Sequence, residues 1–201
     1  MDQPRLTGLE RILLVLLFAL SLFLRLTALD AFLTPDEPKW HTRSESFAAA
    51  LRERDWPLTY QTGHPGVVTM WLGAAASELG LQPPAFLSAP AIRQLMRAPS
   101  PAPGTGLPPL TVGARLLVAL LTWLGTVALY PLLCRLFHPR TALLATALVV
   151  LDPFFLALSR LHHLDALLTT FSGLSIGCLL VYRLRSRHWA CLALSGAAAG
   201  L

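Results

Sequence analysis

The chain has 201 residues, of which 54% are hydrophobic and only 13% are charged. A soluble domain carries about 25% charged residues, so this composition excludes a disordered chain and an ordinary water-soluble globule. The net charge of +5 would suit a nucleic-acid-binding protein, but the basic residues form no patch and cluster at the ends of apolar segments. We therefore expect a polytopic membrane protein that has no nucleic-acid partner.

The apolar residues form five segments. The first covers residues 12–29, a length of about 27 Å as a helix, which is enough to cross the hydrocarbon core. No small-x-small cleavage site follows it, which favours an uncleaved helix over a signal peptide. The other segments cover residues 111–136, 141–158, 164–182 and 189–201. The sequence thus predicts an all-α transmembrane helical bundle with four spanning helices, the incomplete start of a fifth, and a long outer loop at 30–110.

The positions of the arginines predict the orientation of this bundle. Arg5 and Arg11 precede the first helix, Arg135 and Arg140 lie between the second and third, and three more arginines follow the fourth. Alternate loops are therefore basic, which places these loops and the N-terminus in the cytoplasm. We expect a multi-pass protein of the bacterial inner membrane, with the long first loop and the short loop before the fourth helix facing outward.

Two interfacial helices are expected in the long outer loop. Thr34 and Glu37 fit a capping box, with Pro35 at the first helical position, and the helix should run to about Glu53. Its apolar stripe places Trp40 at the level of the lipid headgroups. The second helix should cover residues 67–79 and is too short to span. Its apolar side is expected to comprise Val67, Val68, Trp71, Leu72, Ala75 and Leu79. A third, short helix is expected around residues 91–97.

Asp36 and Glu37 follow the first helix at the water boundary. One interpretation is that these carboxylates cap the next helix and complement its dipole. The other is that they act as a general base in an outward-facing active site. His64 lies in a polar His-Pro-Gly turn, where it is either a turn residue or a group that reaches the same site.

A second polar cluster lies between the third and fourth helices and contains Arg160, His162, His163 and Asp165. It could be a solvated turn in which Asp165 caps the fourth helix. Alternatively, Arg160 could bind a phosphate and Asp165 could orient a histidine or bind a divalent cation. Asp152 lies inside the third apolar segment beside Pro153, and we expect it to bond backbone groups that the proline frees. Arg25 is expected to extend to the outer interface.

These motifs, in this order, resemble the GT-C superfamily of integral-membrane glycosyltransferases. The acidic pair after the first helix, the His-Pro turn between two interfacial helices, and the later Ser159-Arg160-x-x-x-x-Asp165 stretch are similar to the protein O-mannosyltransferase-like group (glycosyltransferase family 39) and to the related aminoarabinose transferases. Gly66 replaces the proline that is more usual in the turn. Family members also continue with more helices, so we expect this chain to be the N-terminal portion of a larger protein.

The resemblance implies a sugar donor linked to polyprenyl phosphate and an inverting transfer to an acceptor on the outer face. The acceptor class, whether protein, lipid or glycan, stays open, and so does a requirement for a metal. Asp36 matches the first-loop carboxylate that deprotonates or orients the acceptor, and Asp165 matches the second-loop acid. Arg160, His162 and His163 are candidates for binding the donor phosphate.

Two alternative functions remain at this stage. The first is a multipass transporter or flippase component, but transporters place their binding residues near the middle of the membrane, whereas the polar residues of this chain lie mainly at its outer surface. The second is an inactive truncated fragment that only inserts into the membrane.

Overall fold

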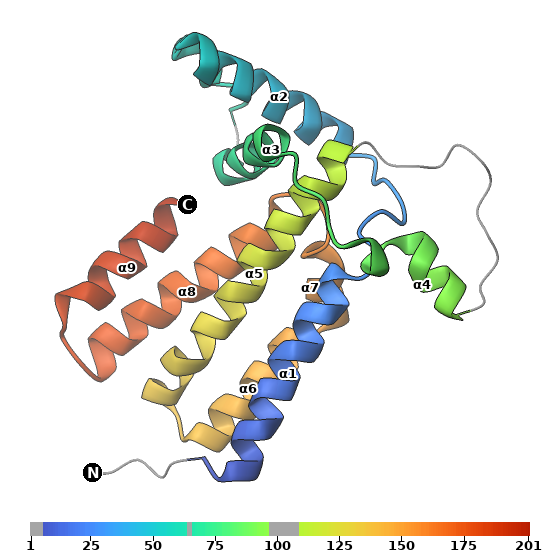
Figure 1. Cartoon of the computed structure of the whole chain (residues 1–201). Coiled ribbons are helices and arrows are strands. Elements are labelled where there is room, and N and C mark those ends of the chain that lie inside the picture. Colours follow the sequence, from blue (N-terminus) through green and yellow to red (C-terminus); the bar gives the residue numbers. More distant parts are fainter. Residues whose placement is uncertain (1–5, 64–65, 97–108) are drawn as a thin grey trace.

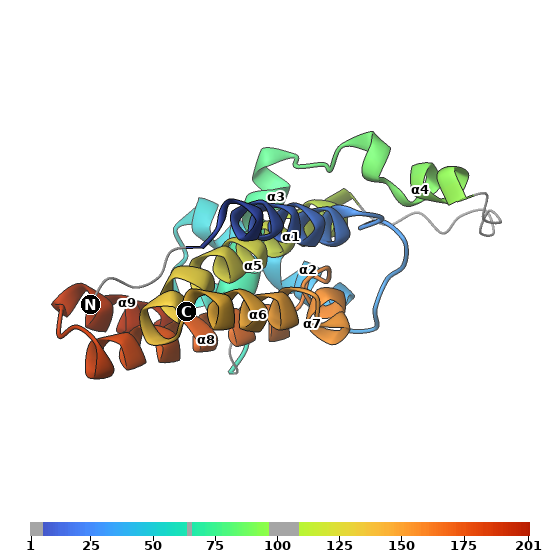
Figure 2. The same ribbon diagram turned by 90° about the horizontal axis from the view of Figure 1, so that it is seen from below.

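The computed structural model describes residues 6–63, 66–96 and 109–201. These parts of the chain contain helices and no strand, which confirms the all-α prediction. In Figure 1 the helices α1 (Gly8–Leu26), α5 (Pro109–Leu136), α6 (Pro139–Val150), α8 (Asp165–Leu184) and α9 (Trp189–Gly200) form a bundle. The central helix α5 packs against α1, α6 and α8, and α9 packs against α8. Figure 2 shows the same bundle from below.

By length and composition, α5 and α8 are the two helices of the described chain that could cross a membrane. The mean hydropathy of their apolar segments is 2.0 and 1.5, yet only 28% and 22% of these segments are buried in the fold. A core helix of a soluble protein would be mostly buried. These exposed apolar surfaces therefore favour a membrane environment.

The third apolar segment forms two helices rather than one. Helix α6 ends at Val150, and α7 (Pro153–Leu158) begins three residues later. Pro153 cannot donate a backbone hydrogen bond and does not fit inside a continuous helix. The Oδ1 atom of Asp152 caps α7 by accepting a hydrogen bond from the backbone N–H of Phe155 at 2.6 Å. The segment predicted at 141–158 is therefore divided at the expected irregularity beside Pro153, and Asp152 bonds a backbone group there as expected.

Arg25 lies inside the bundle and does not extend to the outer interface as expected. Its side chain is fully buried and donates hydrogen bonds to Ser21 on α1 and to the carbonyl oxygen of Val150 at 3.4 Å. Its guanidinium lies 5.4 Å from the centre of the Phe155 ring. Arg25 thus holds α1 against the break between α6 and α7.

The outer loop contains α2 (Glu37–Glu53), α3 (Val67–Leu79) and α4 (Ala89–Met96). Helices α2 and α3 pack together across the first turns of α5 (Figure 1). Trp40 and Phe47 of α2 form a small core with Met70 and Ala74 of α3, as the predicted α2 stripe requires. Trp40 is only 2% exposed, so the expected position of its ring at the lipid headgroups is wrong.

The side of α3 that packs inside the fold differs from the apolar side that the sequence predicts. Its buried residues are Thr69, Met70, Gly73, Ala74 and Ala76, whereas Val67, Trp71 and Leu79 are exposed. Small residues let helices approach closely, and a Cβ atom at Gly73 would lie 2.2 Å from the Oγ of Ser44. Close packing against α2 therefore selects the small side chains and leaves the large apolar ones on the surface.

Candidate functional site

The two members of the acidic pair have opposite environments. Glu37, the first residue of α2, is fully buried. The predicted capping box forms only in part, because α2 begins at Glu37 and its N-cap residue Asp36 makes no side-chain capping bond. The backbone N–H of Thr34 donates to the Oε2 of Glu37 at 2.9 Å, as the box requires, but the Thr34 hydroxyl also donates to Oε2, at 2.8 Å, and does not accept a backbone N–H of the described chain. The Glu37 carboxylate thus fixes the segment that leads into α2.

Arg115 on α5 forms a buried ion pair with Glu37. Its Nε donates to Oε1 at 2.7 Å, and its Nη2 donates to Oε2 at 2.5 Å. Burial acts to raise the pKa of Glu37, but hydrogen bonds from Arg115, Thr34 and the His162 backbone outweigh burial and hold this pKa at about 2. The carboxylate is therefore charged at neutral pH, and its charge is balanced inside the fold.

The same guanidinium also binds the chain that follows α1. Arg115 donates to the carbonyl oxygens of Leu29 and Phe32, at 2.5 and 2.6 Å. Arg160, from the loop after α7, donates to the carbonyls of Thr27 and Ala28. Carbonyl groups at a helix C-terminus lack partners within the helix, and cations satisfy them well. The two arginines therefore connect the end of α1 to the outer ends of α5 and α7.

Asp36 points to solvent, in contrast to Glu37. About 58% of its side chain is exposed, and its partner is Lys39, whose Nζ lies 3.2 Å from Oδ1. An exposed ion pair of this kind contributes little to stability. Asp36 therefore offers an accessible carboxylate next to a buried, rigid anchor.

The second polar cluster contacts α2 directly. The backbone N–H of His162 donates to the Oε1 of Glu37 at 2.9 Å, and the His163 ring meets the Trp40 ring edge-on with 6.0 Å between centroids. His163 Nδ1 lies 3.2 Å from the Oδ2 of Asp165, and both side chains are partly exposed. The structure thus joins the two clusters that the sequence places about 125 residues apart.

His162 is buried, unlike His163. Its Nε2 lies 3.1 Å from the carbonyl oxygen of Thr69 and therefore carries the proton. Its Nδ1 is buried and has no hydrogen-bond partner among the described residues. Burial lowers the pKa of His162 to about 4, so the ring is neutral at neutral pH. His162 therefore packs the second loop against α3 and is not exposed to a ligand.

Two further residues, His41 and Arg115, lie at the contact between the two polar clusters and were not among the predicted site residues. His41 accepts or donates a 2.7 Å hydrogen bond with Thr111 of α5, and its ring lies 5.3 Å from that of His162. Arg115 could have been found as a charged residue within an apolar spanning segment, because such residues are costly and commonly functional. His41 carries no such signal in the sequence.

Gly66, the last residue of the His-Pro-Gly turn, lies beside Trp40. Gly66 has a φ of +137°, and a Cβ atom at this position would lie 2.2 Å from the Trp40 ring. Proline cannot adopt this φ, so this backbone conformation excludes a proline at position 66 and favours glycine. His64 itself, together with Pro65, lies outside the described residues. The described residues also contain no group of three or more His, Cys, Asp or Glu side chains arranged to hold a metal ion.

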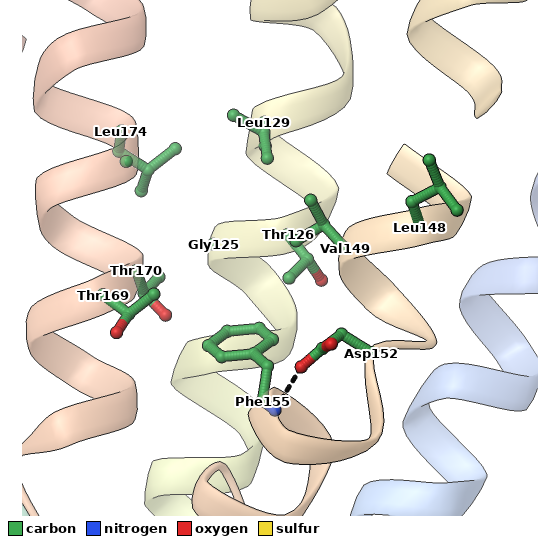
Figure 3. Close-up of a pocket in the computed structure, with 11 residues that line it drawn as sticks. Gly125, Thr126, Leu129, Leu148, Val149, Asp152, Phe155, Thr169, Thr170 and Leu174 are labelled. Atoms are coloured by element: carbon green, nitrogen blue, oxygen red, sulfur yellow. Dashed lines mark hydrogen bonds between the residues drawn. The ribbon is translucent and has the colours of Figure 1, made fainter. Parts of the chain in front are cut away.

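An apolar cavity of about 440 Å³ lies below the second loop, between α5, α6, α7 and α8. Figure 3 shows side chains from these helices around it, with Asp152 at one edge directed at the Phe155 backbone. Its volume falls within the ~300–1,000 Å³ that is usual for ligand pockets. On α8 the cavity begins at Thr169, whose hydroxyl bonds to the carbonyl of Asp165. The cavity therefore starts one helical turn from the second polar cluster.

Comparison with known families adds one result. Residues 107–201 match the model of the family described as dolichyl-phosphate-mannose-protein mannosyltransferase. The matched segment contains Arg115, the second polar cluster and α8, and it begins after the acidic pair. Neither a curated protein nor a solved structure matches the chain. The match agrees with the resemblance drawn from the sequence, and it shows that residues 107–201 are similar to this family of glycosyltransferases.

Proposed function

We propose that the chain is the N-terminal part of a GT-C transmembrane domain that transfers a sugar from a polyprenyl-phosphate-linked donor to an acceptor on the outer face, with inversion. The family description favours mannose as the sugar and a protein as the acceptor. The observation that carries the proposal is the contact between the two polar loops, through Glu37 with His162 and Trp40 with His163. This contact creates one polar site where the bundle meets the outer loop.

Asp36 is the general base in this proposal. Its carboxylate is accessible to an acceptor hydroxyl, whereas all the hydrogen bonds of Glu37 are directed into the fold. We assign Glu37 and Arg115 to positioning, because their ion pair fixes the start of α2 and thus the backbone of Asp36. General-base help of this kind contributes about 10²- to 10⁴-fold to a rate.

Lys39 and His163 are the accessible groups of this site that could receive the donor phosphate, and Asp165 orients His163. Lys39 lies beside Asp36, and His163 lies beside Asp165 with its ring partly exposed. Arg160 and His162 are already engaged with α1 and α3, so we assign them to holding the loop in place.

The apolar cavity below Asp165 would receive the first part of the isoprenoid tail of the donor. A lipid-linked sugar requires an apolar surface that continues from the phosphate site into the membrane. The cavity has an apolar lining that begins within one turn of Asp165, so the tail could enter it without passing through water.

The test compares Asp36→Asn with Glu45→Gln, which removes an exposed carboxylate from the same helix, in membranes that contain the complete gene product. With polyprenyl-phosphate mannose as donor, we expect Asp36→Asn to lower the turnover number at least about a hundredfold at normal expression. Glu45→Gln should retain full activity. Near-normal turnover of Asp36→Asn would remove Asp36 from the mechanism.

One observation favours a second candidate, a transporter or flippase component. Transporters commonly bind substrates at broken helices, and the break between α6 and α7 places Asp152 at the edge of the apolar cavity. Uptake of a lipid-linked sugar into vesicles without any glycosyl transfer would support this function. A 201-residue chain that fails to bind the donor while a longer form binds it would indicate an inactive fragment.

A further inference from the structure

A basic groove lies at the opposite end of the bundle from Asp36, where α5 ends and α9 begins (Figure 1). It is a cavity of about 680 Å³ between α5, α8 and α9. Arg135, Arg185 and His188 form its polar edge, while Val181 and Leu194 form part of its apolar wall. The groove therefore combines cationic groups at the end of the bundle with an apolar surface that continues along the helices.

The positive charge of this groove is not balanced within the described chain. Arg135 and Arg185 are both exposed, and neither forms an ion pair with a described carboxylate. Arg185 donates one hydrogen bond to the carbonyl oxygen of Leu136 at 2.8 Å, which caps α5. The Nη1 of Arg135 reaches only the Sγ of Cys191, at 4.0 Å. Both guanidinium groups thus retain N–H donors for an external anion.

We propose that this groove binds the phosphate group of an anionic phospholipid, with one acyl chain along Val181 and Leu194. Guanidinium groups bind phosphate through paired, charge-assisted hydrogen bonds. Basic pockets between membrane helices at the headgroup level are suited to such lipids. A soluble phosphate would satisfy the arginines but would leave the apolar wall without a partner. This lipid site is separate from the proposed transfer site and does not depend on it.

The experiment measures lipid binding to the purified 201-residue chain in a neutral detergent by native mass spectrometry. The probes are phosphatidylglycerol, phosphatidylcholine with the same acyl chains, and inorganic phosphate. One arginine near a membrane surface contributes about 1 kcal/mol, so we expect Arg135→Gln to weaken phosphatidylglycerol binding about fivefold. Arg135→Lys should retain part of the affinity, and phosphatidylcholine should bind more weakly to the unchanged protein.

Arg187→Gln is the matched control, because Arg187 carries the same charge in the α8–α9 loop and is not among the described residues that line the groove. It should change the affinity less than twofold. An equal loss in Arg135→Gln and Arg187→Gln would show attraction by net charge alone and would overturn the site. Competition by millimolar inorganic phosphate, or equal binding of phosphatidylcholine, would overturn the assignment to an anionic lipid. Circular dichroism of each variant verifies that its helices are intact.

Discussion

Removing the counter-charge of Glu37 tests whether the outer loop is held by a buried ion pair. Arg115→Met leaves a charged carboxylate at a position with no solvent exposure. The hydrogen bonds of Arg115 are the largest of the interactions that lower the pKa of Glu37, so removing them leaves the carboxylate without its main compensation for burial. Breaking a buried pair by removing one partner typically costs ~3–5 kcal/mol. We therefore expect a loss of about 3 kcal/mol or more.

Hydrogen exchange of the α2 amides in lipid nanodiscs measures this loss as a smaller free energy of local opening. The matched control is Arg52→Met, which removes the exposed ion pair between Arg52 and Glu78 that connects α2 with α3. This control should cost less than about 1 kcal/mol. Both substitutions replace an arginine that pairs with a glutamate, but only Arg115 is buried and also binds the carbonyls of Leu29 and Phe32.

A double variant separates charge from packing. In Glu37→Leu/Arg115→Met no charge is left uncompensated, and apolar replacements of buried pairs are often tolerated. We expect more than half of the single-variant loss to be recovered, with a remainder because Arg115 also binds the carbonyls of Leu29 and Phe32. Losses that simply add in the double variant, or an Arg115→Met effect no larger than that of Arg52→Met, would refute the reasoning.

Three further predictions concern pH, packing and the cavity. The folded pKa values of His162 and Glu37 lie at about 4 and about 2, below the ordinary 6.5 and 4.5. As the pH falls, the unfolded chain therefore binds protons at these groups before the folded chain does, and acid destabilises the fold. Thermal unfolding should therefore show stability falling in two steps, from about pH 6.5 to 4 and from about pH 4.5 to 2. Gly73→Ala should cost about 1–3 kcal/mol by overpacking, whereas Gly196→Ala, whose Cβ meets no atom within 4 Å, should be neutral or stabilising in chemical denaturation. A Cβ at Gly173 also meets no atom within 4 Å, so Gly173→Phe should fold normally and fill the cavity. We expect this variant to raise the KM for a long-tailed donor more than the KM for a short-tailed donor. Equal KM changes for the two donors would exclude the cavity as the tail site.

Local signals in the sequence predict the helices of the outer loop well. The end of α2 at Glu53 and the bounds of α3 at Val67 and Leu79 agree with the structure, because periodicity and glycines mark them within a few residues. The buried side of α3 could not be predicted in this way. Its selection depends on a close approach to Ser44 of α2, and hydrophobicity alone favours the large side chains that remain outside.

In the candidate site, too, the sequence predicts what depends on nearby residues and does not predict what depends on residues far along the chain. Motif order indicates that the acidic pair and the second polar cluster belong together, and the structure brings them into contact through Glu37 and His162. The sequence does not distinguish the accessible histidine from the buried one, because His162 and His163 are neighbours with the same chemistry. Their difference depends on the backbone of Thr69 and on Trp40, which lie far from them in the chain.

The acidic pair acquires its two environments from helix geometry. Successive residues of an α-helix point about 100° apart, so two neighbouring side chains at the start of α2 cannot both face α5. Arg115 binds the second of them, and Asp36 is consequently left facing water. Glu37 is then required for its charge although it is not available to a substrate, since its fixed orientation determines that of Asp36. Two adjacent acids thus have separate roles, one as a buried anchor for the helix and the other as the accessible carboxylate of the site.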